Sequence, residues 1–231
     1  MTIKLVLFDI DGTILLTGGA GKRAMDRALV EVFGSSGPND HPFGGKTDPQ
    51  IVRELMRIEG HEDLHIDRQM AALLDRYVAY LGQELDTDDA RVGTMPGIPE
   101  LLDALERRDD VIVGLLTGNL VAGAQTKLRA VGIDFDRFKV GAFGSDHEAR
   151  GELPAVAQRR AREQLGVDIP GRDVIVIGDT PADVHCGQSI GARAIAVATG
   201  HYSVEQLRAH NPAVVFGDLA DTAAVIDAIV A

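Results

Sequence analysis

The chain is poor in cysteine. Its 231 residues include one cysteine, Cys186. A single cysteine excludes an internal disulfide and any zinc or iron–sulfur site built from several thiolates. Because structural disulfides belong to oxidising compartments, we expect a reducing setting and a cytoplasmic location.

Basic and aromatic residues are also scarce. Lys and Arg number 23 against 35 Asp and Glu, so the formal net charge is −12, and aromatic residues make up 4 % with no tryptophan. Nucleic acids and anionic membranes attract Lys and Arg, and base stacking needs aromatic side chains. We therefore expect neither partner. A small anionic substrate stays compatible with this charge, because a bound cation can invert the local field.

Long apolar runs are absent as well. No stretch approaches the roughly 18 residues that a membrane-spanning helix needs. The apolar run at residues 5–8 stops at Asp9, which is not the pattern of a secretory signal. We expect no membrane association.

Short apolar runs alternate with helix-like stretches. The runs, of which we expect the last at a sheet edge, cover residues 3–8, 111–116, 139–143, 174–177, 194–198 and 213–216. Apolar residues recur at helical spacing in 98–107, 120–131 and 153–165. Near-continuous apolar strands are typical of parallel sheets covered on both faces. The sequence predicts an α/β fold with a doubly wound, mainly parallel sheet.

One interval breaks this alternation. About 100 residues separate the first two runs, far more than an ordinary crossover. Helical patterns within it cover residues 20–33, 48–58 and 67–85, and hinge-like segments flank it at 18–21 and 94–97. We expect a helical cap over 18–94, inserted into an α/β core of 1–17 and 95–231. At that point of the chain it would cover the carboxyl ends of the strands, where open α/β sheets bind ligands.

Oxygen-bearing side chains follow several strands. Asp9 and Asp11 follow the first run, Thr117 the second, and Asp179 and Asp183 a later one. Four carboxylates in one crevice repel one another unless a cation neutralises them. Oxygen ligands without clustered His or Cys favour Mg²⁺ over zinc. The sequence therefore predicts a Mg²⁺ site at these strand ends.

The motifs resemble those of the haloacid dehalogenase-like superfamily, in the same order and over the whole chain. They are residues 9–13 (DIDGT), Thr117, a downstream basic residue and residues 178–183 (GDTPAD). Residues 17–20 and 45–48 (GKTD) are similar to phosphoglycolate-phosphatase-like members.

The resemblance implies a phosphoryl-transfer mechanism. Asp9 would be the nucleophile that forms an aspartyl-phosphate, and Asp11 would protonate the leaving alkoxide and then deprotonate water. The Asp9 carboxylate, the Asp11 backbone carbonyl and Asp179 would ligate Mg²⁺, and Asp183 would support them.

The same resemblance implies a phosphate site. Thr117 and the amides of Gly118 and Asn119 would bind the phosphoryl oxygens. The family's third motif is commonly Lys-Pro, and this sequence has no such pair in the expected stretch. Arg150 is our first candidate for that cation and Arg159 the second. An arginine fork binds phosphate in a different geometry from a lysine ammonium.

Some of these residues also fit simpler roles. Asp183 lies three residues after Thr180, as in a capping box, and Asn119 fits the N-cap of the next helix. Residues 18–22 superficially suggest a nucleotide loop, but they lack its first glycine and its hydroxyl residue, so we interpret them as a hinge.

These observations lead to one function hypothesis with alternatives. The leading hypothesis is a Mg²⁺-dependent phosphatase that acts on a small phosphorylated metabolite as a monomer or homodimer. Lys46, Lys22 or Arg53 of the cap would contact the leaving group. A phosphomutase keeps both aspartates of the first motif and stays open. A dehalogenase needs neither Asp11 nor Asp179, and a receiver-like signalling module has no long cap.

Overall fold

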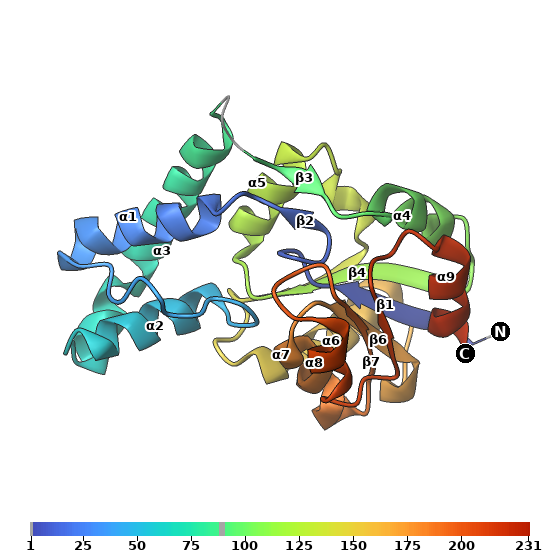
Figure 1. Cartoon of the computed structure of the whole chain (residues 1–231). Helices are drawn as coiled ribbons and strands as arrows, with labels where there is room; N and C mark the ends of the chain where they lie inside the picture. Colours follow the sequence, from blue (N-terminus) through green and yellow to red (C-terminus); the bar gives the residue numbers. More distant parts are fainter. Residues whose placement is uncertain (1, 88–90) are drawn as a thin grey trace.

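A six-stranded parallel sheet forms the centre of the molecule (Figure 1). The computed structural model describes residues 2–87 and 91–231; Met1 of the expected core and residues 88–90 of the expected cap lie outside them. The strand order is β5-β4-β1-β6-β7-β8. The strands are β1 (Lys4–Phe8), β4 (Val111–Thr117), β5 (Val140–Phe143), β6 (Val174–Gly178), β7 (Arg193–Val197) and β8 (Val214–Phe216). The predicted doubly wound α/β fold is confirmed, and every expected strand is present within one residue at either end.

Helices cover both faces of this sheet because the strands are apolar on both. Successive residues of a strand point to opposite faces. Val6 and Phe8 of β1 lie in one core cluster, which α4 (Ile98–Glu106), α5 (Val121–Ala130) and α9 (Thr222–Val230) complete. Leu5 and Leu7 lie in the other, against α6 (Leu153–Leu165). Two short helices, α7 (Pro181–Cys186) and α8 (Val204–Arg208), enclose a third cluster with β7.

Single helical turns join several elements. They are η1 (Phe135–Arg137), η2 (Arg150–Glu152), η3 (Gly171–Asp173) and η4 (Gly187–Ile190). Of these, η2 lies between β5 and α6 and carries Arg150.

A helical insertion lies between β1 and β4 along the chain. It consists of α1 (Ala20–Phe33), α2 (Asp48–Ile58) and α3 (Asp63–Leu85), which pack around a core of their own. A two-stranded antiparallel ribbon, β2 (Leu15–Leu16) with β3 (Gly93–Thr94), pairs the two segments that join it to the sheet. In Figure 1 the insertion lies beyond the end of the sheet at which β1 stops.

The start of α3 differs from the expectation by four residues. The apolar pattern begins at Ile66, which is fully buried, and we expected the helix from residue 67. The first turn, from Asp63, has exposed side chains that leave no apolar periodicity in the sequence. The N-cap residue Glu62 makes no side-chain cap hydrogen bond, so no capping motif in the sequence marks this start either.

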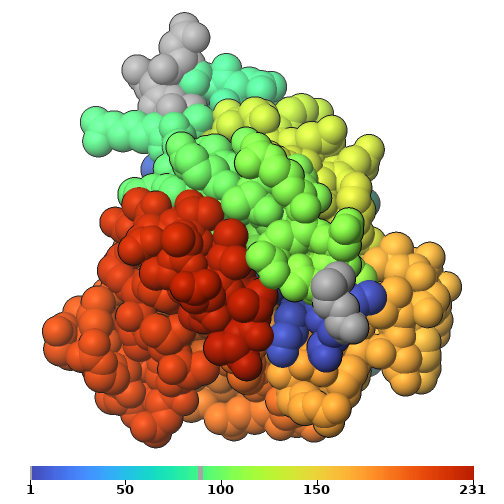
Figure 2. Space-filling model, turned by 90° about the vertical axis from the view of Figure 1, so that its right-hand side faces the viewer, coloured from blue at the N-terminus to red at the C-terminus, as the bar shows by residue number. Residues whose placement is uncertain are grey.

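The two ends of the sheet differ in character. Figure 2 views the amino end of the strands, where the blue start of the chain lies between the green and orange segments. The helical insertion lies at the opposite, carboxyl end (Figure 1). Within the described ranges, no helix has both the length and the apolar character needed to cross a membrane.

Candidate active site

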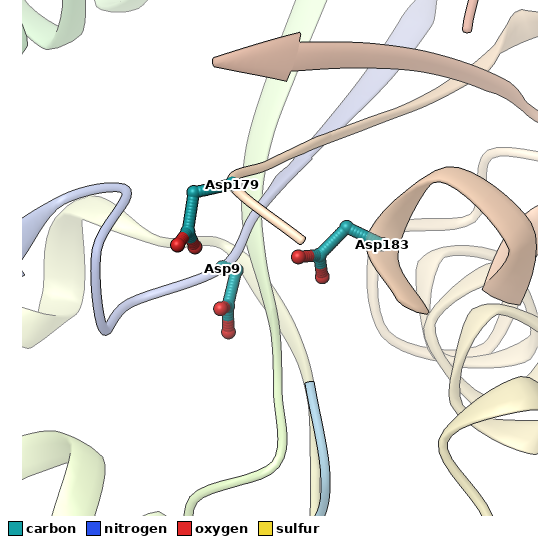
Figure 3. A group of neighbouring side chains, drawn as sticks. All are labelled: Asp9, Asp179 and Asp183. Atoms are coloured by element: carbon teal, nitrogen blue, oxygen red, sulfur yellow. The ribbon is translucent and has the colours of Figure 1, made fainter. Parts of the chain in front are cut away.

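Three buried carboxylates meet at the carboxyl end of the sheet. Asp9 directly follows β1, Asp179 directly follows β6, and Asp183 lies on α7. One oxygen of each lies within 4.8 Å of the others. Figure 3 shows Asp9 and Asp179 on the loops that leave the strands, with the Asp183 carboxylate pointing toward them. Parallel strands produce this convergence because their carboxyl ends share one edge of the sheet.

Two carboxyls of this cluster, Asp179 and Asp9, have raised pKa values, chiefly because they are buried. Burial, together with the nearby Asp9 and Asp183, raises the pKa of Asp179 to about 8. Burial also raises the pKa of Asp9, although Arg150 opposes the shift. Carboxylates disfavoured in this way are stabilised by a bound cation.

Arg150 is the cation of the cluster. Its guanidinium lies 3.1 Å from Oδ1 of Asp9 and donates a hydrogen bond to Asp183. Burial alone would lower the pKa of Arg150, but the Asp183 and Asp9 carboxylates raise it above its ordinary value. Arg159, the second sequence candidate, is exposed on α6 and pairs with Glu163. The structure does not bring Arg159 to the cluster, because its position on α6 faces solvent.

Glycines make room for Asp179. Gly12 has φ +82°, and a Cβ there would lie 2.4 Å from a carboxylate oxygen of Asp179. A Cβ on Gly200 would lie closer still, at 1.8 Å. The hydroxyl of Thr13 lies 3.2 Å from the same carboxylate and donates to it. The DIDGT motif therefore supplies the backbone space that Asp179 needs.

Asp183 takes part both in the cap of α7 and in the carboxylate cluster. The amide and hydroxyl of Thr180 donate to its Oδ2, at 3.0 and 2.6 Å, which completes the capping box that starts α7. Its Oδ1 accepts from Arg150. The two roles considered for Asp183 are compatible because each uses a different carboxylate oxygen.

Asp11 pairs with a different cation from Asp9 and Asp183. Nζ of Lys127 donates to both of its carboxylate oxygens, at 2.8 and 2.7 Å, and Nδ2 of Asn119 donates to Oδ2 at 2.7 Å. The sequence analysis missed Lys127. Its sequence signal is a lysine in the apolar stripe of α5, three residues after Ala124 and directly before Leu128, all of them buried.

Thr117 is the last residue of β4, and Gly118 and Asn119 follow it in the loop beside Asp11. The Thr117 side chain is fully buried, and its hydroxyl oxygen accepts from the amide and from Nδ2 of Asn119, at 3.3 and 2.8 Å. The suggested N-cap role of Asn119 is wrong. The N-cap of α5 is Leu120, and the Asn119 side chain turns to Asp11 and Thr117.

The helical insertion contacts this loop through Asp48. The Asp48 amide donates to the Gly118 carbonyl at 2.8 Å, and its buried carboxylate accepts from the Leu120 amide at 2.9 Å. A Cβ on Gly118 would lie 1.9 Å from the carbonyl oxygen of Lys46, so only glycine permits this approach. The first turn of α2 therefore packs on the loop that directly follows Thr117.

A cavity of about 760 Å³ opens over the cluster between the sheet and the insertion. Asp9, Asp11 and Asp179 line it from the sheet, and Lys22 and Lys46 line it from the insertion. Lys22 pairs with Asp26, and Lys46 pairs with Glu54.

Arg53 does not line this cavity within the described part of the chain. It bonds to Glu148 and Asp67, at 2.7 and 2.8 Å, and so links the insertion to the loop before η2. We expected Arg53 to contact a leaving group, but the structure does not place it at the cavity. Its guanidinium is paired with two carboxylates instead.

Comparison with known proteins assigns the family. The haloacid dehalogenase-like hydrolase family matches residues 6–188. The chain belongs to this family, and the resemblance predicted from the motifs is confirmed.

Individual relatives are phosphatases by name. The chain is 30 % identical over 218 residues to N-acetylmuramic acid 6-phosphate phosphatase from Pseudomonas aeruginosa, a match that covers 91 % of this chain and 88 % of the relative. It is 24 % identical over 227 residues to phosphoglycolate phosphatase from Pseudomonas putida, covering 94 % and 77 %.

A solved structure shares the fold over nearly the full length. CbbY from Rhodobacter sphaeroides, solved in complex with phosphate, superposes with a TM-score of 0.71 at 21 % identity, covering 95 % of this chain and 96 % of that one. At this identity the likeness concerns the fold.

Proposed function

We propose that this protein is a Mg²⁺-dependent phosphatase that hydrolyses a small phosphate monoester through an aspartyl-phosphate on Asp9. The observation that carries the proposal is the buried cluster of Asp9, Asp179 and Asp183, of which Asp9 and Asp179 line the cavity. Two relatives of this chain are named as phosphatases of small phosphorylated metabolites, which supports the same class of substrate.

The cluster of three carboxylates suits a divalent cation. Its donors are oxygens, and burial together with the nearby Asp9 and Asp183 raises the pKa of Asp179, which a bound cation would oppose. Carboxylates of Asp9 and Asp179 and the backbone carbonyl of Asp11 would hold Mg²⁺, with Asp183 supporting them. When bound, the ion supplies positive charge beside the phosphoryl oxygens.

The remaining groups suit a phosphoryl site. Both acceptor positions of the Thr117 hydroxyl are taken by Asn119, so its own hydrogen is left to donate to a phosphoryl oxygen. The amides of Gly118 and Asn119 would add donors. Such groups are fixed before substrate arrives, which is how charge in a phosphoryl-transfer transition state is stabilised.

The proposed reaction has two steps. In the first, an oxygen of Asp9 forms a bond to phosphorus, the ester P–O bond breaks, and Asp11 gives its proton to the leaving oxygen. In the second, water attacks phosphorus and gives a proton to Asp11, and the bond from phosphorus to Asp9 breaks. Inorganic phosphate leaves, and both aspartates return to their starting forms.

The insertion would contact the leaving group. Lys22 and Lys46 line the cavity on the side facing Asp9, and the ring of Phe43 lies 5.6 Å below the Lys22 ammonium. We propose residues 18–94 as a cap whose movement admits substrate.

The protein is proposed to act as a monomer or a homodimer, and size-exclusion chromatography distinguishes the two.

A phosphate-release assay on a panel of small phosphate esters tests the function. We expect activity with Mg²⁺, its loss with EDTA, and loss of about a thousandfold or more in Asp9→Asn. Asp103→Asn is the matched control, because Asp103 is exposed and pairs with Arg137 on the surface. Full activity in Asp9→Asn would refute the nucleophile. A positional isomer in place of free phosphate would identify a phosphomutase, and halide release would identify a dehalogenase.

A further inference from the structure

Lys127 is a buried lysine that the proposed reaction does not use. It lies on α5 and lines the cavity, yet only 4 % of the residue is exposed. A buried ammonium is costly unless acceptors surround it. Its acceptors here belong to the proposed machinery, so a purely structural ion pair would be an unusual use of this position.

All three hydrogens of the Lys127 ammonium have partners. Nζ lies 2.8 and 2.7 Å from Oδ1 and Oδ2 of Asp11, and 2.6 Å from Oδ1 of Asn119. Asn119 closes the triangle, because its Nδ2 donates to Oδ2 of Asp11 at 2.7 Å. Neither Asp11 nor Asn119 can rotate without breaking a bond to Lys127.

The triangle makes the two oxygens of Asp11 unequal. Oδ2 accepts from Lys127 and Asn119, whereas among the described residues Oδ1 accepts from Lys127 alone. A carboxylate oxygen offers two acceptor positions, so Oδ1 keeps one open. The Asp11 side chain is 44 % exposed against 5 % for Lys127, so the carboxylate faces the open cavity and the ammonium lies behind it.

The helical insertion covers Lys127 from the other side. A Cβ on Gly21 of α1 would lie 3.5 Å from Nζ, which is ordinary van der Waals contact. Asp48, on the first turn of α2, is close enough for Lys127 to lower its pKa, although burial raises that pKa overall. The ammonium therefore lies at the boundary between the core and the insertion and is shielded by both.

We propose that Lys127 is a positioning residue for the phosphatase reaction. It fixes Asp11 so that Oδ1 is the oxygen that gives the proton to the leaving group and later takes one from water. The proposal rests on the function proposed above. It concerns proton transfer by Asp11 and leaves the bond between Asp9 and phosphorus unchanged.

Two substrates with different leaving groups separate this role from a loss of structure. A simple alkyl phosphate releases an alkoxide that needs a proton, whereas p-nitrophenyl phosphate releases a stabilised phenolate that does not. The parameter kcat/KM covers only the steps up to release of the leaving group. The alkyl-to-aryl ratio of kcat/KM is independent of the fraction of folded enzyme, because that fraction cancels.

Lys127→Met tests the proposal. We expect the alkyl-to-aryl ratio to fall about tenfold or more, since general acid catalysis contributes about a hundredfold or more. Lys127→Gln keeps a neutral amide donor without the charge, so it should lower the ratio less, and it serves as the second variant if Lys127→Met does not fold. Lys4→Met is the matched control: it removes a partly buried pair with Asp173 at the amino end of the sheet and should leave the ratio unchanged.

The outcomes are distinct. An unchanged or raised ratio in the folded Lys127 variants would overturn the positioning role, even if both rates fell together. Failure of the proposed function would appear differently, as an inactive wild-type protein or an active Asp9→Asn variant.

Discussion

Arg150 and Asp183 form a buried hydrogen-bonded ion pair, although they lie 33 residues apart in the chain. Arg150 comes from the single turn η2 and Asp183 from the first turn of α7. Their pairing holds the guanidinium of Arg150 next to the Asp9 carboxylate. The short turn between β5 and α6 thus brings a cation to two of the three clustered carboxylates.

Arg150→Met should lower activity about a hundredfold or more, because a donor beside the reacting phosphoryl group is lost. It should also destabilise the fold by about 3–5 kcal/mol, since Asp9 and Asp183 would stay buried without their cation. Arg159→Met should change stability by about 0.5 kcal/mol or less, and its activity should stay at the wild-type level. Steady-state kinetics and urea unfolding measure both, and equal losses in the two variants would contradict the assignment.

The stability of the metal-free protein should fall as pH rises. Asp179 has a pKa of about 8 in the folded state and an ordinary value of 3.8. Between these values the native state holds a proton that the unfolded state has released, so stability declines with rising pH across that window and levels off above it.

The proposed Mg²⁺ ion would bind the deprotonated carboxylates, so the Tm gain on adding it should be larger at pH 8 than at pH 6. Thermal scans in EDTA and in Mg²⁺ measure both effects. Asp179→Asn should flatten the pH dependence in EDTA, and a Mg²⁺ gain independent of pH in the wild type would contradict the interpretation.

Gly12→Ala should weaken metal-dependent activity. The new Cβ would meet the Asp179 carboxylate at 2.4 Å and displace it. Gly132→Ala is the matched control, because Gly132 also has positive φ, +74°, but no described residue has an atom within 4 Å of its Cβ position. In both variants, backbone strain should lower the free energy of unfolding by about 1–2 kcal/mol. The Mg²⁺ concentration for half-maximal activity should rise about tenfold or more in Gly12→Ala alone.

Asp48→Ala should loosen the contact between the insertion and the loop after β4. The Leu120 amide would lose its acceptor, at a cost of about 1 kcal/mol. Hydrogen exchange of residues 118–124 should become faster. Asp67→Ala, which removes an exposed partner of Arg53 in the same insertion, should leave that segment unchanged. Unchanged exchange in Asp48→Ala would show that Asp48 does not hold this loop.

Cys186 should resist thiol reagents in the folded protein. Burial raises the pKa of its thiol to about 12, so almost no thiolate forms at pH 8. Ellman's reagent should react with it only after denaturation. A fast reaction in native buffer would contradict this prediction.

The fold was predictable in most of its elements. Apolar runs of β-strand length and helical spacings gave all six strands of the sheet, because burial on both faces requires near-continuous apolar sequence. The start of α3 and the ribbon of β2 with β3 were not predicted, since they depend on backbone pairing more than on apolar pattern.

The sequence by itself determined which residues stand at the strand ends, and hence that Asp9, Asp11 and Asp179 share one edge of a parallel sheet. Tertiary structure decided which cation serves which acid. Arg150 reaches Asp9 and Asp183, Lys127 reaches Asp11, and Arg159 reaches neither. Ion pairs between distant segments depend on how helices pack and in which direction side chains point. Strand periodicity is local, and so it can be recognised without the fold.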